Sequence, residues 1–163
     1  MESDFIQTVN AHAGIIQNVC RLYGKDDEDR KDLYQEIVLQ LWRAFPAFRG
    51  ESKASTWMYR VALNTAISLF RRQSRQIAPV PIDQELLNLD QYIASPDADP
   101  QMQQFYRAVD QLSLIEKAIV FLYLDDNSYE EIARITGISQ SNVGVKLNRI
   151  KGKLKKIVEL TNE

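Results

Sequence analysis

Apolar residues recur every three or four positions along most of the chain, which is the spacing of one face of an α-helix. The first such stripe predicts one helix over residues 3–23, with Ser3 as its cap and Gly24 at its end. A second stripe follows an acidic turn, whose carboxylates favour a helix N-terminus, and it stops at Pro46. A third stripe begins near Thr56. The N-terminal part of the chain therefore predicts three helices.

The segment between residues 76 and 100 has a different composition. It contains four of the five prolines of the chain, and Asp and Gln fill much of the rest. Proline removes a backbone donor and is disfavoured inside helices and sheets, so this segment predicts an acidic linker. Residues 85–93 allow a short helical or hydrophobic patch within it.

Helix start signals dominate the part of the chain that follows the linker. A short helix comes first, and two capping boxes, Ser113 with Glu116 and Ser128 with Glu131, then predict two further helix N-termini. The predicted fold class is all-α, with two small helical domains. These domains are residues 1–75 and 101–163, joined by the linker 76–100.

Composition limits the chemistry that the chain can support. There is one cysteine, Cys20, and one histidine, His12, in 163 residues. One cysteine cannot form an internal disulfide, and the two residues together cannot build a structural zinc site of the usual kind. No apolar run is long enough to span a bilayer, and the N-terminus carries no secretory signal. The sequence predicts a cytoplasmic protein without metal or cofactor, not an enzyme, in which Cys20 is a small buried side chain.

Charge alternates along the chain although the net charge is only −2. Acids predominate in residues 1–36 and 76–106, whereas bases predominate in residues 43–75 and 132–158. Two basic patches on a mildly acidic chain fit a protein that touches DNA at two places. They also fit a protein that needs a larger partner to hold it on DNA.

Residues 128–156 carry the pattern of a helix-turn-helix. Ala133 is small, as required where two helices cross closely, and Gly137 can adopt the left-handed conformation of a tight turn. Ser139 is a favourable N-cap for the second helix, and apolar residues such as Val143 hold that helix down. This pattern predicts a second helix that lies in the major groove of duplex DNA.

The second helix of this motif is rich in cations without acidic partners nearby. These cations are Lys146, Arg149, Lys151, Lys153, Lys155 and Lys156. Phosphate contacts explain them, whereas base edges are read at the start of such a helix. The alternative is an ordinary helical hairpin with a solvated basic face.

The stretch from Arg49 to Arg75 combines aromatic residues, an amide and six cations with a single acid. Aromatic rings stack on unpaired bases, amides read base edges and cations hold phosphates, so the stretch is typical of a single-strand binding surface. Trp57 and Tyr59 lie on different sides of one helix, so only one can face a core easily. The alternative is that Trp57 is a core residue and that the terminal cations only complement the helix dipole.

Three segments together resemble the bacterial RNA polymerase sigma factors of the sigma-70 family, and more narrowly the small extracytoplasmic-function (ECF) group. They read "DLYQEIVLQLWRAF", "FRGESKASTWMYRVALNTAISLFRR" and "LSLIEKAIVFLYLDDNSYEEIARITGISQSNVGVKLNRIKGKL". The resemblance covers nearly the whole chain except the linker, with the motifs in the family order. It implies a non-enzymatic subunit that binds core polymerase, directs it to promoters and helps to melt the −10 element.

The resemblance also implies which residues contact the partners. It places Asp32, Gln35, Glu36 and Trp42 on the surface that docks on core RNA polymerase. It places Lys53, Ser55, Arg60, Asn64, Arg71 and Arg72 on the −10 element. It places Ser139, Gln140, Ser141, Asn142, Lys146 and Arg149 on the −35 element. An anti-sigma protein is implied as a further partner, and direct membrane insertion is not.

Two positions depart from the family pattern. Gly144 stands where many relatives have Lys or Arg, and Thr136 stands where Leu is usual. Glycine inside a helix costs about 1 kcal/mol relative to alanine, so a close approach of the backbone to DNA is one hypothesis for Gly144.

Two other function classes remain as alternatives from sequence. A stand-alone helix-turn-helix regulator explains residues 128–156 but leaves residues 49–75 without a purpose. A DNA recombinase with a C-terminal helix-turn-helix needs a mixed sheet and a catalytic nucleophile with supporting arginines, and the sequence predicts no strands on which to build one.

Overall fold

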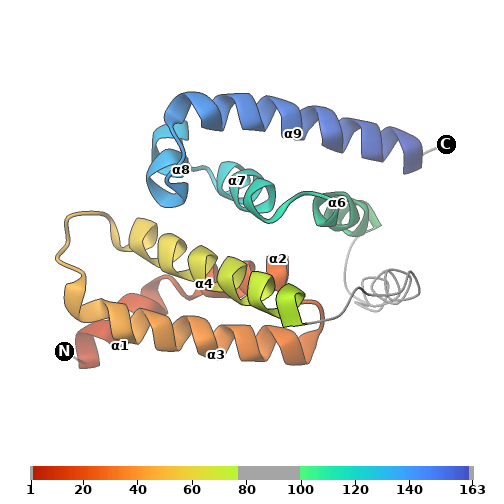
Figure 1. The fold of residues 1–163 in the computed structure, drawn as a ribbon. Coiled ribbons are helices and arrows are strands. Elements are labelled where there is room, and N and C mark those ends of the chain that lie inside the picture. Colours follow the sequence, from red (N-terminus) through yellow and green to blue (C-terminus); the bar gives the residue numbers. More distant parts are fainter. Residues whose placement is uncertain (1, 77–99, 162–163) are drawn as a thin grey trace. The chain divides into compact units, whose positions relative to one another are not determined.

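The computed structural model describes residues 2–76 and 100–161, and Figure 1 shows the helices that these residues form. The described residues form α-helices and one short 3-10 helix, without strands, which confirms the all-α prediction. Two compact units are present, one built from α1 to α4 and the other from α6 to α9. The predicted linker, with its possible patch at residues 85–93, lies almost entirely outside the described residues.

The N-terminal unit is a bundle in which α2, α3 and α4 pack against one another. Its elements are α1 (Glu2–Ala11), α2 (Ala13–Tyr23), α3 (Asp27–Ala44), η1 (Phe45–Ala47) and α4 (Ala54–Gln76). The core between these helices contains Ile16, Ile37, Leu41 and Met58, all fully buried. Cys20 is also buried, and burial raises the pKa of its thiol to about 11, which confirms that it packs as a small hydrophobic side chain.

The prediction of a single helix over residues 3–23 is wrong, because the helix is interrupted at His12 and forms α1 and α2. Ser3 lies inside α1 and is not its cap. The break lets the two parts pack on different neighbours. Phe5 of α1 contacts Trp42 at the end of α3, whereas α2 packs along α3 and α4. Tertiary contacts therefore override a hydrophobic pattern that continues across the break.

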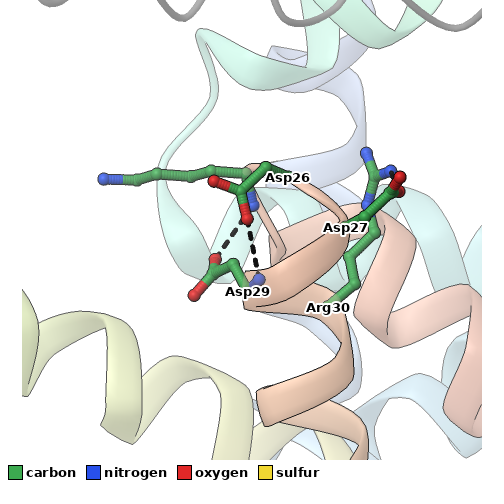
Figure 2. Close-up of polar contacts among 5 residues, drawn as sticks. Asp26, Asp27, Asp29 and Arg30 are labelled. Carbon is green, nitrogen blue, oxygen red and sulfur yellow. Dashed lines mark hydrogen bonds and ion pairs between the residues drawn. The ribbon is translucent and has the colours of Figure 1, made fainter.

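The N-terminus of α3 is capped by its own acidic turn (Figure 2). Asp26 is the N-cap, and its side chain accepts a hydrogen bond from the Asp29 backbone amide at 2.7 Å. The Asp29 carboxylate accepts one from the Lys25 backbone amide at 2.9 Å, and Arg30 reaches Asp27 at 3.4 Å. Carboxylates at this end also complement the helix dipole, as the sequence predicted.

Gly24 ends α2 and brings the start of α3 close to the end of α2. Its backbone is extended, with φ −78° and ψ 134°, and its amide donates to the Cys20 carbonyl oxygen at 2.8 Å. A Cβ atom at this position would lie 2.7 Å from that carbonyl oxygen and would collide with the Arg30 side chain. Only glycine therefore fits the α2–α3 corner as it stands.

The described part of the C-terminal unit contains four helices, of which the last three carry the predicted helix-turn-helix and its support. They are α6 (Pro100–Asp110), α7 (Leu114–Leu124), α8 (Tyr129–Thr136) and α9 (Gln140–Thr161). Helices α7 and α8 pack on α9 over a core that includes Ile119, Leu122, Ile132, Leu147 and Ile150. None of the described helices combines the length and hydropathy needed to cross a bilayer.

The predicted signals of the helix-turn-helix are confirmed at the atomic level. The Ser113 hydroxyl and the Glu116 carboxylate form a complete capping box at the start of α7. Ser128 caps α8, accepting from the Glu131 amide at 3.1 Å. Gly137 ends α8 in the left-handed conformation, with φ 80°, which a residue with a side chain rarely adopts.

The corner at Gly24 yields the first prediction. We expect Gly24→Ala to lower the free energy of unfolding of the N-terminal unit by about 1–3 kcal/mol, because the new methyl group meets backbone that cannot move aside. Urea unfolding followed by tryptophan fluorescence measures this, since Trp42 and Trp57 are the two tryptophans of the chain and both lie in this unit.

Gly14→Ala is the matched control within α2. A Cβ at Gly14 meets nothing within 4 Å, so stability should stay unchanged or rise. Equal stability of the two variants would contradict the close approach described at Gly24.

Candidate functional site

One face of α4 carries most of the cationic and polar residues predicted to bind the −10 element. Arg60, Asn64 and Arg71 are exposed on α4, and Lys53 is exposed immediately before it. Their spacing of seven, four and seven residues puts all four on one line along the helix. Ser68 is exposed on the same face and was missed by the sequence reasoning, because a serine carries no charge signal.

The structure separates the other two predicted −10 residues from this line. Ser55 is half-buried and lies five residues before Arg60, which places it about 140° away around the helix. Arg72 is exposed and flanks the line next to Arg71. The exposed surface of α4 is therefore a polar and cationic stripe, and Ser55 is not part of it.

The aromatic residues of α4 are not free to stack on bases, contrary to the expectation from sequence. Tyr59 is only 5% exposed. Trp57 is half-buried, stacked on the Phe48 ring with centroids 4.8 Å apart and packed against Phe45 at 6.0 Å. The amide and the cations of this surface are therefore accessible, whereas its aromatic rings serve the fold.

A second stripe runs along the exposed face of α3. Asp32, Gln35, Leu39 and Trp42 are all exposed, and their spacing of three, four and three residues aligns them. Leu39 is 40% exposed and Trp42 is 43% exposed, which is unusual for large apolar side chains. Sequence reasoning missed Leu39, although its position between Gln35 and Trp42 on the same helix face could have revealed it.

Glu36 turns away from this stripe toward α4. It is half-buried, accepts a hydrogen bond from the Gln40 amide at 3.0 Å, and lines a cavity of about 170 Å³ between α2, α3 and α4. Asp32 lines the same cavity and is also exposed on the stripe. The structure thus brings Asp32, Gln35 and Trp42 together and leaves Glu36 at the edge of their surface.

The start of α9 presents the residues that were predicted to read the −35 element. Ser139 is the N-cap, since its hydroxyl accepts from the Asn142 amide at 3.2 Å. The following residues Gln140, Ser141 and Asn142 are exposed, as is Arg149, whereas Lys146 is half-buried. Ser139 therefore caps the helix in addition to lying at its exposed start.

Two further residues of α9 lie on an exposed line of the helix. Val145 is 47% exposed and Asn148 is exposed, and both align with Ser141 at helical spacing. In a major groove, an apolar side chain can contact a thymine methyl group and an amide can pair with adenine. Charge reasoning missed both residues because neither is charged.

Two of the α9 lysines have partners on α7, which corrects the prediction that no acid lies nearby. Lys153 binds the Glu116 carboxylate at 2.8 Å. Lys151 lies 4.7 Å from the centroid of the Tyr123 ring. Burial alone would raise the pKa of Glu116, but hydrogen bonds from Lys153 and Ser113 outweigh it and lower that pKa. These contacts fix α9 on α7 and leave fewer cations for DNA.

Gly144 lies beside the Tyr129 ring, on the flank of α9 that faces α8. A Cβ atom at Gly144 would meet that ring at 3.5 Å, which is an ordinary van der Waals contact. The packing of the free protein therefore tolerates alanine here. Among the described residues of the C-terminal unit, none requires glycine at this position.

Comparison with known proteins identifies both units. Residues 8–76 match the family model Sigma-70 region 2, and residues 102–154 match the family model Sigma-70, region 4. The chain belongs to the sigma-70 family. Its similarity to named ECF sigma factors places it in the ECF group. Sigma factors bind core RNA polymerase and direct it to promoters, and both matched regions support this function here.

Curated relatives of this sigma factor come from several bacteria. RNA polymerase sigma factor YlaC of Bacillus subtilis (strain 168) is 29% identical over 143 residues, which are 83% of this chain and 81% of YlaC. The ECF RNA polymerase sigma-E factor of Escherichia coli (strain K12) is 32% identical over 120 residues. That alignment covers 66% of this chain and 62% of the sigma-E factor.

Two solved structures share the fold of this sigma factor at 18% sequence identity. One is the sigma factor RpoE in complex with the anti-sigma factor NepR from Bartonella quintana, with a TM-score of 0.74 and coverage of 96% of this chain and 97% of RpoE. The other is CnrH in complex with the cytosolic domain of CnrY, with a TM-score of 0.67 and coverage of 98% and 90%.

The Glu116–Lys153 contact of this sigma factor predicts a pH dependence. Because the pKa of Glu116 is lowered in the folded state, its stabilising effect is complete above the unfolded value of about 4.3 and is lost as pH falls through the folded value. We expect Glu116→Gln to speed hydrogen exchange in α9 relative to wild type at about pH 6, with the difference shrinking as the pH falls below that unfolded value.

The exposed Glu159 provides the control on α9 itself. Glu159→Gln should exchange like wild type at every pH. A Glu116→Gln difference that persists undiminished at low pH would argue against the ion pair as its source.

Gly144 provides a further prediction for region 4. Gly144→Ala should raise the stability of the C-terminal unit by up to about 1 kcal/mol, because alanine is the better helix former. Gly152→Ala is the matched control, since a Cβ there meets nothing within 4 Å and Gly152 lies in the same helix. Hydrogen exchange in α9 measures the stability of both variants.

The hypothesis of close DNA approach then separates the two glycines. If the α9 backbone approaches DNA at Gly144, binding to a −35 duplex should fall for Gly144→Ala and not for Gly152→Ala. Equal affinity of both variants would leave Gly144 without a DNA-binding role.

Proposed function

We propose that this chain acts as a promoter-specificity subunit that recruits core RNA polymerase and opens the DNA at the −10 element. The observation that carries the proposal is the order of two units in one chain. A region 2 unit with an exposed polar and cationic helix face precedes a region 4 unit with a helix-turn-helix. A stand-alone regulator would not need the first of these.

The two units bind different partners. Residues 1–75 bind core polymerase and the −10 element, residues 101–163 bind the −35 element, and residues 76–100 link them. The subunit acts in the cytoplasm by binding alone and catalyses no reaction. The polymerase supplies the chemistry of transcription.

The polymerase surface is the stripe on α3. Asp32 and Gln35 offer polar contacts there, and the exposed apolar groups of Leu39 and Trp42 lose water on docking, which favours association. Glu36 contributes from the edge of the same surface. An apolar centre with charged neighbours is a common composition of a protein interface.

The cationic stripe on α4 holds the −10 element after the strands separate. Lys53, Arg60 and Arg71 contact phosphates, with Arg72 at the flank, and Asn64 hydrogen-bonds to a base. Ser55, half-buried on another side of the helix, acts by supporting the start of α4. This assignment differs from the resemblance only in the role of Ser55.

The start of α9 reads the −35 element as duplex DNA. Gln140, Ser141 and Asn142 lie at the base edges, with Val145 and Asn148 one and two turns further on. Arg149 and Lys146 contact phosphates, and Ser139 maintains the helix cap. The resulting promoter sequence follows from these side chains and differs from that of relatives with Lys or Arg at the position of Gly144.

An anti-sigma protein is a further proposed partner. The two similar structures are complexes, one with the anti-sigma factor NepR and one with the cytosolic domain of CnrY. A protein that covers the α3 stripe would compete with polymerase for the exposed Leu39 and Trp42. Such competition would keep this sigma factor inactive until the partner is released.

Retention of bacterial core RNA polymerase by tagged protein tests the proposed function. We expect wild type to retain polymerase. The Leu39→Asp variant should retain about tenfold less polymerase, because a charge would be buried at the interface. Tyr34→Asp is the control, since Tyr34 is also exposed on α3 but lies about 140° from Leu39 around the helix.

Circular dichroism confirms that each variant is folded before the comparison. Folded wild type that retains no polymerase would refute the proposed function. Equal retention by wild type and Leu39→Asp would keep the function and remove α3 as the docking surface.

A further inference from the structure

Trp57 contacts both ends of the exposed loop that precedes α4. Its backbone amide donates a hydrogen bond to the Lys53 carbonyl oxygen at 3.1 Å. Its ring stacks on the Phe48 ring, with centroids 4.8 Å apart and 24° between the ring planes. The residues between these ends, 49–52, are all exposed. Trp57 therefore closes the loop at its base while the loop itself projects into solvent.

The chain before the loop is fixed from the same side. The Phe48 amide donates to the Phe45 carbonyl oxygen at 3.0 Å, and the Phe45 ring lies 6.0 Å from Trp57. Within the loop, Gly50 has φ 74°, a left-handed conformation that turns the chain back toward α4. Contacts at both ends of a loop reduce its conformational freedom.

The stack lies at the edge of the core that holds the bundle together. Phe48 and Trp57 are half-buried, whereas the neighbouring Met58 is fully buried and faces the core. The two rings thus pack outside the fully buried core between α2, α3 and α4. A change of the Phe48 ring can therefore alter the loop while that core keeps its own contacts.

We propose that the Phe48–Trp57 stack positions residues 49–53 for the unpaired −10 strand, so that both rings are positioning residues that do not touch DNA themselves. The inference rests on the proposed function and assigns the two aromatics a role other than base stacking. A flexible loop loses conformational freedom when it binds, and a loop that is already ordered binds more tightly. The loop carries Arg49 and ends at Lys53, so its order fixes Lys53 at the start of the α4 stripe and Arg49 close to it in the chain.

Timed trypsin digestion of the free protein tests the closure of the loop. Trypsin cleaves after Arg49 and Lys53, and cleavage requires local opening. We expect Phe48→Leu to raise the cleavage rate at both sites about tenfold, because leucine cannot stack. Phe48→Tyr, which keeps the ring, should cleave like wild type. Ile15→Val, a conservative change in the buried face of α2, controls for general loss of stability. Unchanged cleavage in Phe48→Leu would overturn the inference.

Holoenzyme reconstituted with core polymerase tests the effect on DNA. The probe is a fluorescent pool of single-stranded DNA oligonucleotides of random sequence. We expect Phe48→Leu to bind polymerase like wild type but to retain about tenfold less oligonucleotide, with retention restored in Phe48→Tyr. An open loop with undiminished retention would refute the positioning role.

The two measurements also separate this inference from the proposed function. Wild-type holoenzyme that retains no oligonucleotide would contradict the −10 function itself, and with it the positioning role. The digestion result would then describe only the fold. Loss of polymerase binding and of oligonucleotide retention to the same extent in Phe48→Leu would mean that the stack supports the whole bundle, which also overturns the inference.

Discussion

Burial of one face of α4 is the constraint on which the N-terminal unit depends. Met58, Ala62 and Ala66 are almost completely buried, and the two alanines let neighbouring helices approach the α4 backbone closely. Because an α-helix has about 3.6 residues per turn, burial of this line places Arg60 and Asn64 on the opposite, solvent-facing side. The same helix is thus the centre of the core and the support of the cationic stripe, so its packing register and its exposed chemistry cannot vary independently.

A comparable division governs α9 in the C-terminal unit. Its buried line packs on α7 and α8, and two of its lysines are engaged by Glu116 and Tyr123 of α7. Counting cations along α9 therefore overstates the charge that is available to a ligand. The exposed line that remains is less basic than the sequence suggests, and it includes the neutral residues Val145 and Asn148. Selectivity in such a helix depends on shape and hydrogen bonding as much as on charge.

Local rules of sequence predicted the elements whose signals lie within a few residues. The capping box of α7, the glycine turn at Gly137 and the cap at Ser139 all involve neighbours in the chain, and all are confirmed. The break at His12 was missed because the apolar spacing continues through it and only the packing of Phe5 decides the matter. The Glu116–Lys153 contact was missed because its partners are 37 residues apart.

Sequence predicted some residues of the candidate surfaces and missed others. Charged residues on α4 and α9 were found from their clustering, and the line through Asp32, Gln35 and Trp42 came from family resemblance. Leu39 and Val145 were missed, since an apolar residue in a helix is expected to be buried and only the three-dimensional structure reveals that these two are not. Tyr59 and Trp57 were overvalued for the opposite reason, because their rings are used by the fold.

The position of Cys20 has a consequence for how this protein meets oxidants. It is the single thiol of the chain, it is 4% exposed, and burial keeps it protonated far above neutral pH. The thiolate form of cysteine reacts with peroxides and alkylating reagents, so Cys20 is protected from them in the folded N-terminal unit. The Cys20 sulfur becomes reactive only when α2 separates from its neighbours. The rate at which a thiol reagent modifies Cys20 therefore reports how often the bundle opens.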